Sequence, residues 1–330
     1  MLPLPTLRCL ASRAPAIAPL RRSFAAGKVA LTPRQRARTL PAALWRSLHL
    51  TQASHDGAPK ALCSDRLAID LTAALLPDHE VVALLSGSEG GIQEAEVAGI
   101  HGAFLDRIVL DAVGKRLRQV VIIGAGMDTR AYRLELPPQM RIVEVEEAEV
   151  SEAKLAVLSA AGHHTRCRLV SAAVPPAVLS CVPGQAQAAE VQAGLRAALQ
   201  ANVDLNKPCL LILGEGLLNG VWAGVEEAVL TELAEVAAEG SRLVAPIHAS
   251  DTVTASAAAV RLKMALGAAG WTRVDVVGEK SLSRIFFRAP PDDEAVLIVG
   301  ERGQGQAPGR PSPSREPAAG GGGGPREVSF

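Results

Sequence analysis

A glycine turn after a predicted buried strand is the part of this sequence best suited to hold a nucleoside cofactor. Residues 119–124 are rich in β-branched side chains and run directly into Gly124-Ala125-Gly126. Residues that lack a Cβ let the backbone approach a ligand closely. The sequence therefore predicts a cofactor site at which Gly124, Ala125 and Gly126 contact the ligand.

Two acidic residues follow the glycine turn at the spacing expected for a ribose contact. Glu144 and Glu146 end the second predicted strand, about twenty residues after the turn, where an acid can accept hydrogen bonds from both ribose hydroxyls. Alternation along a strand places both on one face, so one holds ribose while the other meets solvent or a capping residue. Asp128 lies just past the turn, where an acid caps the next helix, and we expect a salt bridge from Arg130.

The residue in the third glycine position separates two classes of cofactor. Dinucleotide sites use a third glycine to pack the helix against the strand near the pyrophosphate, and here Thr129 stands at that position. This favours a cofactor without pyrophosphate, such as S-adenosylmethionine. A nicotinamide-dependent oxidoreductase and a purely structural glycine turn are the alternatives.

The elements that must position these residues alternate between short β-branched runs and longer amphipathic segments. This pattern predicts a doubly wound α/β, Rossmann-like fold with a seven-stranded, mainly parallel sheet, an antiparallel last strand and an N-terminal helical cap. The expected strands are 119–124, 141–146, 168–172, 209–214, 243–248, 272–277 and 294–300. The expected helices are 94–116, 147–161, 187–201, 225–239 and 255–269.

The two ends of the chain differ in composition from this middle part. Residues 1–55 contain no acidic side chain and many arginines, which is typical of a transit peptide followed by a disordered basic segment. Arg22-Ser23-Phe24-Ala25-Ala26 is similar to a mitochondrial processing site, with the chloroplast as the alternative destination. Residues 303–330 are rich in Gly and Pro, so we expect them to be disordered and the catalytic domain to span 56–302.

The composition of the whole chain narrows the range of partners. Lysine plus arginine balance aspartate plus glutamate at 34 each, which gives no reason to expect a nucleic acid. No stretch is long and apolar enough to predict a membrane span. The five cysteines form no C-x-x-C pair, so we expect reduced thiols and no metal site.

Five short segments together resemble the leucine carboxyl methyltransferase family, most closely its bacterial-type branch of S-adenosylmethionine-dependent methyltransferases. The resemblance extends over residues 61–249. The segment 124–134 (GAGMDTRAYRL) looks like the family signature, and 142–146 (IVEVE) is similar to its ribose-binding strand. The other three are 64–68 (SDRLA), 104–106 (FLD) and 215–218 (EGLL), which resemble the D-P-x-A, F-F-D and E-G-L-L elements.

The resemblance implies a doubly wound sheet with S-adenosyl-L-methionine across the carboxyl ends of its strands. Three positions depart from the family pattern. His101 replaces the arginine that binds the cofactor carboxylate, Ala173 replaces the acid near adenine, and Gly220 replaces a tyrosine. His101, Arg107 and Arg130 are candidates to compensate for the missing arginine.

The family further implies O-methylation, with a carboxylate or hydroxyl on a small molecule or a protein C-terminus as acceptor. Glu215 lies at the end of the fourth strand, beside the expected methyl group. It is either a cofactor contact or an acid at the start of the next helix. His248 ends the fifth strand, as a base for a hydroxyl acceptor or as an ordinary strand-end histidine. A degenerate, non-catalytic scaffold of the same fold is the alternative function.

Overall fold

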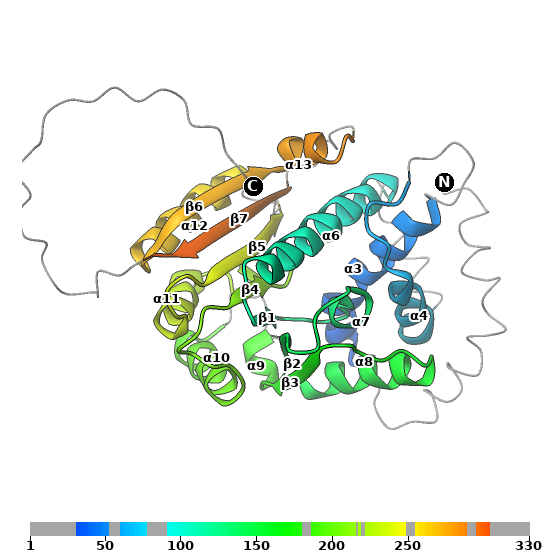
Figure 1. Cartoon of the computed structure of the whole chain (residues 1–330), viewed down its shortest axis with the longest axis horizontal. Helices are drawn as coiled ribbons and strands as arrows, with labels where there is room; N and C mark the ends of the chain where they lie inside the picture. The colour runs from blue at the N-terminus through cyan, green and yellow to red at the C-terminus, as the bar shows by residue number, and fades with distance from the viewer. Residues whose placement is uncertain are drawn as a thin grey trace, which may run out of the picture.

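A seven-stranded sheet with helices on both faces forms the centre of the computed structural model (Figure 1). The structure describes residues 31–52, 60–77, 91–179, 186–215, 217–218, 222–248, 255–288 and 295–303. The strand order is β3-β2-β1-β4-β5-β7-β6. The chain therefore starts the sheet at β1, in the middle, and winds outward in both directions.

The strands lie at the expected positions and run in the expected directions. They are β1 Gln119–Ile123, β2 Arg141–Glu146, β3 Arg168–Ala173, β4 Leu210–Leu213, β5 Arg242–His248, β6 Trp271–Gly278 and β7 Ala295–Arg302. β1 to β5 pair in parallel, whereas β7 lies antiparallel between β5 and β6. The link between β6 and β7 contains only the short helix α13 (Glu279–Ile285), which agrees with an antiparallel return instead of a crossover.

Alternation along the central strands divides the core between the two faces of the sheet. Val121 and Val143 pack against one side, which α9 (Pro176–Leu179), α10 (Ala188–Asn202), α11 (Glu226–Val236) and α12 (Ala255–Ala268) cover. Val120 and Ile142 face the other side, toward α6 (Gly91–Gly114) and α13. Because both faces are covered, β1 and β4 are almost entirely apolar instead of alternating with polar residues, whereas β2 carries the buried acids Glu144 and Glu146 toward its end.

A third cluster joins the helical cap to the edge of the sheet. It unites α3 (Pro33–Gln52), α4 (Arg66–Leu75) and α8 (Ala148–Ala160). Figure 1 shows these three helices together on the side of the molecule away from β6. The expected N-terminal cap is thus present, and it packs beside the end of β1, where the glycine turn begins.

The prediction of a disordered segment as far as residue 55 is wrong for its last part. Residues 33–52 form helix α3, in which Leu40, Leu44 and Leu48 are fully buried. These leucines recur every fourth residue and so share one helix face, which supplies the apolar contact that a disordered tail lacks. We expect a targeting signal in residues 1–30 and disorder in residues 304–330, and both segments lie outside the described residues.

The described cysteines and helices bear on two further expectations. Cys63, Cys167 and Cys209 are buried free thiols, as expected of reduced cysteines. Burial is the main reason that the pKa of Cys63 is raised to about 11 and that of Cys209 to about 11. Among the helices of the described ranges, none has the length and apolar character needed to cross a membrane.

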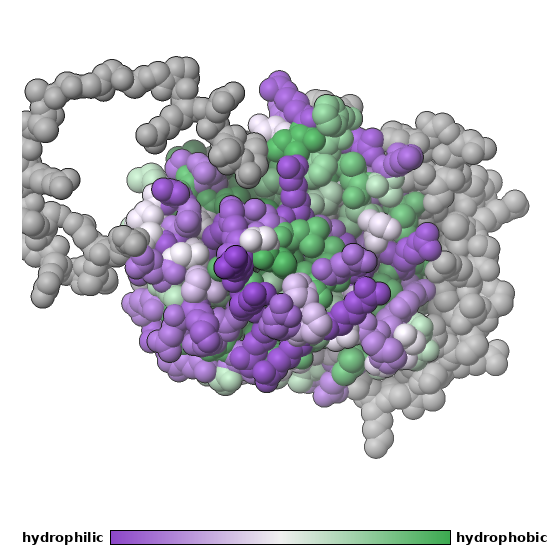
Figure 2. Space-filling model, viewed as in Figure 1, coloured by the Kyte–Doolittle hydropathy of each residue, from purple (hydrophilic) through white to green (hydrophobic). Residues whose placement is uncertain are grey.

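The surface is largely polar on the face that Figure 2 presents, with apolar side chains gathered in its upper middle. Large exposed apolar side chains include Leu110 on α6 and Phe287 just after α13. Scattered exposed side chains of this kind are normal for a folded domain.

Replacing a buried leucine of α3 tests whether this helix belongs to the folded domain. We expect Leu44→Ala to lower the free energy of unfolding by about 2–5 kcal/mol, because it leaves a cavity in the third cluster. The matched control is Leu155→Ala on α8, whose side chain is 53% exposed, and which should change stability by about 0.5 kcal/mol or less. Chemical denaturation measures both, and equal effects would show that α3 does not pack as described.

Candidate active site

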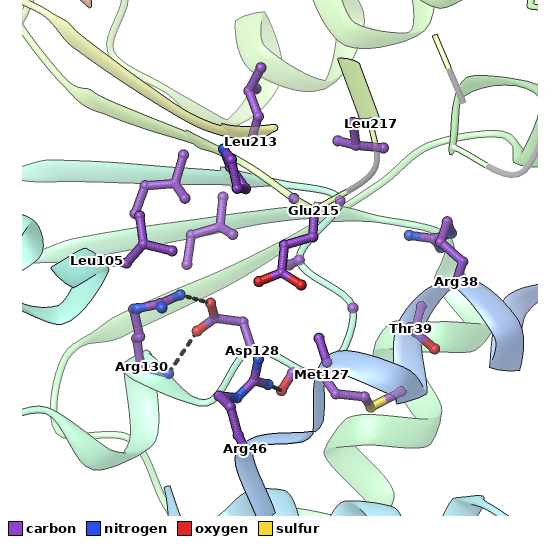
Figure 3. A pocket seen from close by; sticks show the side chains of 18 residues that line it. Arg38, Thr39, Arg46, Leu105, Met127, Asp128, Arg130, Leu213, Glu215 and Leu217 are labelled. Atoms are coloured by element: carbon purple, nitrogen blue, oxygen red, sulfur yellow. Dashed lines mark hydrogen bonds and ion pairs between the residues drawn. The ribbon is translucent and has the colours of Figure 1, made fainter. Parts of the chain in front are cut away.

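An open pocket lies at the carboxyl ends of β1 and β4, under helix α3 (Figure 3). Its empty volume, including solvent at the mouth, is about 630 Å³. Its walls come from the glycine turn, α3, α6, the segment that follows β4, and residues of β1, β4 and β5. The lining includes Gly124, Ala125, Gly126, Met127, Asp128, Arg130, Arg38, Thr39, Arg46, Leu105, Leu213, Gly214, Glu215 and Leu217.

The turn itself requires glycine at two positions. Gly124 and Gly126 have φ values of +68° and +46°, a region that residues with a Cβ rarely adopt. A Cβ on Gly124 would lie 2.8 Å from the Leu217 side chain, and one on Gly126 would lie 3.3 Å from Thr39. The Gly124 amide donates to the carbonyl of Val145 at 2.9 Å, which ties the turn to the end of β2.

A chain of alternating charges connects the glycine turn to the helical cap. Asp106 on α6 accepts from Arg130 Nε at 2.9 Å and from both terminal nitrogens of Arg133, at 2.5 and 2.6 Å. Asp65 accepts from Arg46 Nε at 2.9 Å and lies 3.9 Å from Arg133. Three of the resembling segments thus meet here, because Asp65, Asp106 and the two arginines after the turn belong to separate motifs.

Asp128 bonds the first residue of the next helix, although the N-cap position itself is Thr129 and not Asp128. Its Oδ1 accepts from the Arg130 amide at 2.8 Å at the start of α7 (Arg130–Arg133), and its Oδ2 pairs with the Arg130 guanidinium, which confirms the expected salt bridge (Figure 3). Burial alone would raise the pKa of Asp128, but Arg130 and Arg46 outweigh it and the pKa is lowered. The carboxylate therefore stays ionised at neutral pH.

Arg46 brings a buried positive charge to the pocket from α3. Its Nη2 donates to the Met127 carbonyl at 3.1 Å, and Asp65 holds its Nε. Burial opposes its charge, yet Asp65 and Asp128 offset that cost and the pKa of Arg46 is raised. An anionic group on a ligand would find a fixed cation here.

Glu146, the predicted ribose acid, lies behind the glycine turn and is bonded to it. Its Oε2 accepts from the Gly126 amide at 2.7 Å. Both of its oxygens also bond Arg38 on α3, at 2.5 and 3.0 Å. The side chain is buried and does not line the pocket, whereas Arg38 does. A ligand in the pocket can therefore reach Glu146 only if Arg38 moves.

Glu144 has neither of the roles expected for the acidic pair, because it is buried away from both the pocket and solvent and pairs with a lysine of α8. Its Oε2 lies 2.6 Å from Lys154 Nζ on α8, and neither residue lines the pocket. Full burial raises the pKa of Glu144, although Lys154 acts in the opposite direction. Lys154 also donates to the Asp128 carbonyl at 3.1 Å, so the pair braces the segment after the turn.

The remaining predicted residues occupy different places. Glu215 lines the pocket, and Figure 3 shows its carboxylate pointing into the space between Arg38 and Arg130. His101 is buried on α6, one turn before Leu105, and does not line the pocket. His248 ends β5 opposite Ala295, and its side chain lies outside the description.

The positions that depart from the family pattern are only partly visible. Ala173 ends β3 in register with Glu146, where its methyl group offers no hydrogen bond. Gly220 lies outside the described residues. The structure therefore agrees with the loss of a polar contact at residue 173.

The pocket residues of α3, above all Arg38 and Arg46, were not predicted from the sequence. The absence of acidic residues from this part of the chain favoured a transit peptide over a helix. The spacing of Leu40, Leu44 and Leu48 was the signal that could have identified α3 as part of the fold. No pattern in the sequence indicates which of its arginines face the pocket.

Removing the carboxylate of Asp106 tests the importance of the charge chain. We expect Asp106→Asn to cost about 3–5 kcal/mol of stability, because it leaves Arg130 and Arg133 buried without their shared counter-charge. Asp111→Asn is the matched control on the same helix, since Asp111 also pairs with two cations but its side chain is 36% exposed. It should cost about 1 kcal/mol or less in chemical denaturation. Similar losses in the two variants would contradict a special role for Asp106.

Curated relatives align with the part of the chain that contains this site. A Mycobacterium avium protein named "Putative S-adenosyl-L-methionine-dependent methyltransferase" is 32% identical over 206 residues, which are 60% of this chain and 60% of that protein. A Mycobacteroides abscessus protein with the same name is 30% identical over 191 residues, 57% of this chain and 58% of that protein. The alignments therefore span about three fifths of the length of these relatives.

Solved structures show more distant likeness. A duf574 family protein from Streptomyces avermitilis has a TM-score of 0.45 and 12% identity, with 68% of this chain and 91% of that chain covered. The Haemonchus contortus phosphoethanolamine N-methyltransferase 2 in complex with S-adenosyl-L-methionine has a TM-score of 0.36 and 8% identity, with 62% of this chain and 53% of that chain covered.

The family profile gives the most direct assignment. It matches residues 42–207, from the second half of α3 to the segment before β4, and so includes the glycine turn, Asp106 and Glu146. Glu215 and His248 lie beyond the matched range. The match extends over half of the 330 residues, and the chain belongs to the leucine carboxyl methyltransferase family.

Proposed function

We propose that this protein is an S-adenosyl-L-methionine-dependent methyltransferase that transfers the methyl group to an oxygen atom. One observation carries the proposal: the glycine turn lines an open pocket and its Gly126 amide bonds the acid at the end of β2. Family membership and the names of the mycobacterial relatives support the same cofactor.

Three contacts are expected between the protein and this cofactor, and the residues around the pocket fit two of them. The glycine turn has no Cβ where a ligand must approach, and Arg46 supplies a cation suited to an amino-acid carboxylate. In this role Arg46 compensates for the arginine that His101 replaces. At the third point, the ribose acid Glu146, Arg38 already occupies the carboxylate.

The chemistry of such a site depends mainly on alignment. The bound cofactor would supply a methyl group on a positively charged sulfonium. An acceptor oxygen held in line with the carbon–sulfur bond would take this methyl group, and the sulfur would leave as the neutral thioether. Leu105, Leu213 and Leu217 give the pocket an apolar wall that excludes water from the reacting groups. Glu215 is exposed at the pocket, where its carboxylate can orient an acceptor or accept the proton of a hydroxyl.

The acceptor we propose is a carboxylate or a hydroxyl, on a small molecule or at a protein C-terminus. A carboxylate is already a nucleophile and needs no base, whereas a hydroxyl does. Glu215 is positioned for that role, and His248 remains a candidate base at the end of β5. With a single tyrosine, Tyr132, and few aromatic residues in total, the chain has little to form a pocket for flat aromatic acceptors.

A mitochondrial location, with the chloroplast as the alternative, stays a prediction. Arg38 and Arg46 belong to the folded helix α3, so they no longer support a targeting signal. The basic residues that still support one lie earlier in the chain: Arg8, Arg13, Arg21, Arg22 and Lys28.

Calorimetric titration with S-adenosylmethionine and S-adenosylhomocysteine tests the cofactor. We expect the full chain to bind both, and Gly126→Arg to abolish binding because its side chain meets Thr39 and its backbone has a positive φ. Gly114→Arg is the matched control, since nothing lies within 4 Å of a Cβ at Gly114, and it should bind as the wild type does. Binding of a nicotinamide dinucleotide instead, or of no cofactor at all, would contradict the proposal.

The position of the transferred methyl group tests the acceptor class. With small carboxylic and hydroxy acids and peptides ending in leucine as candidates, we expect products methylated on oxygen. Esters release methanol in mild base, whereas ethers do not. Glu215→Gln should leave ester formation nearly unchanged and slow ether formation by about 10²–10⁴-fold, because only the hydroxyl must lose a proton. A methyl group on nitrogen, sulfur or carbon would rule out O-methylation.

A further inference from the structure

Glu146 already receives a full set of hydrogen bonds from the protein. Its Oε1 accepts from Arg38 Nη2 at 2.5 Å and from the Glu147 amide at 2.8 Å. Its Oε2 accepts from Arg38 Nη1 at 3.0 Å and from the Gly126 amide at 2.7 Å. A carboxylate has about four lone-pair positions. A ribose diol can therefore bond this carboxylate only if a present donor leaves.

Arg38 is the donor most able to leave. The amides of Gly126 and Glu147 belong to the backbone just after β1 and β2, whereas the guanidinium of Arg38 lies at the end of a flexible side chain on α3. Its guanidinium is also bonded to Glu147 Oε1 at 3.1 Å. That second carboxylate gives Arg38 a partner after it releases Glu146, so the cation need not become unpaired.

Helix α3 is built in two parts that are attached to the protein differently. Pro41 has no amide hydrogen, so the helix lacks a hydrogen bond to the carbonyl of residue 37 at this point. After Pro41, the Arg46 contacts with Asp65 and Met127 hold the helix. Before Pro41, Arg38 and Gln35 bond the carboxylates of Glu146 and Glu147. Gln35 Nε2 donates to Glu147 Oε2 at 2.7 Å.

We propose that residues 33–40 form a latch in which Arg38 and the ribose of the cofactor compete for Glu146. The inference rests on the proposed cofactor. Binding of the ribose displaces Arg38 toward Glu147 and loosens the first half of α3, with Pro41 as the hinge. Since Arg38 also lines the pocket, its release changes the wall beside the cofactor as well.

The latch has a measurable effect on the affinity for the cofactor. A site that is open for only part of the time binds with an apparent Kd increased by the inverse of that fraction. Weakening the latch should therefore tighten binding. A purely structural ion pair predicts the reverse, because its loss disturbs the acid that the ribose needs.

Calorimetry and hydrogen exchange on full-length Arg38→Lys, with S-adenosylhomocysteine as the probe, test the latch. Lysine keeps the charge but cannot form the two-pronged contact, so we expect binding about tenfold tighter than in the wild type, as for a site that is open about a tenth of the time. In the wild type, saturating ligand should speed amide exchange in residues 33–40 while it slows exchange at the glycine turn. Arg38→Ala serves as a second variant, and Arg34→Ala, exposed on the same helix, is the matched control.

The outcomes separate the latch from the proposed function. Tighter binding by Arg38→Lys, or binding by either Arg38 variant when the wild type shows none, supports the latch. If the wild type binds but Arg38→Lys binds equally or more weakly, and the ligand leaves exchange in residues 33–40 unchanged or slower, the latch is overturned and the cofactor site stands. If neither the wild type nor the variants bind, and no ligand slows exchange at the glycine turn, the proposed function fails and the latch with it.

Discussion

The position of the glycine turn relative to α6 depends on the carboxylate of Asp106, which two arginines share. Arg130 and Arg133 follow the glycine turn on α7, whereas Asp106 comes from α6. All three side chains are largely buried, so the charges are stable only together. Arg133 also lies 3.9 Å from Asp65, which holds Arg46 of α3. The charges around Asp106 and Asp65 thus connect the sheet, the glycine turn and the cap beside the pocket.

The sequence predicted the sheet well because burial on both faces leaves a clear pattern. β1 and β4 are short runs of apolar residues that end at a glycine, and such runs are typical of strands buried on both faces of a parallel sheet. β2 keeps the β-branched pattern, although Glu144 interrupts it and Glu146 ends it. The glycine turn was predictable for a similar reason, since two glycines within three residues after a buried strand indicate a close backbone approach. The salt bridge between Asp128 and Arg130 was also predictable, because it is a local interaction.

The parts that sequence reasoning did not predict depend on contacts between distant residues. Lys154 pairs with Glu144 from the neighbouring helix, and nothing in either segment indicates the partner. Helix α3 was missed because composition and periodicity disagreed there: an acid-free segment suggests a transit peptide, while leucines at every fourth position predict a helix. Periodicity was the better guide, since it reports burial directly, whereas a lack of acids is also compatible with arginines that pair with acids elsewhere in the fold. Arg38 and Arg46 do so with Glu146 and Asp65.

The same arginines explain why one helix can serve both the stability and the chemistry of the site. A guanidinium bonded to a carboxylate through two charge-assisted hydrogen bonds binds more strongly than a pair of neutral hydroxyls. A ribose that replaces Arg38 on Glu146 must therefore gain free energy elsewhere, at the glycine turn and through the cation of Arg46. Ligands that lack a group for Arg46 have no such gain. Competition at Glu146 weakens the complete cofactor and its nucleoside fragment by the same factor. The preference for the complete cofactor therefore comes from Arg46, while Arg38 sets how much binding free energy any ribose ligand must supply.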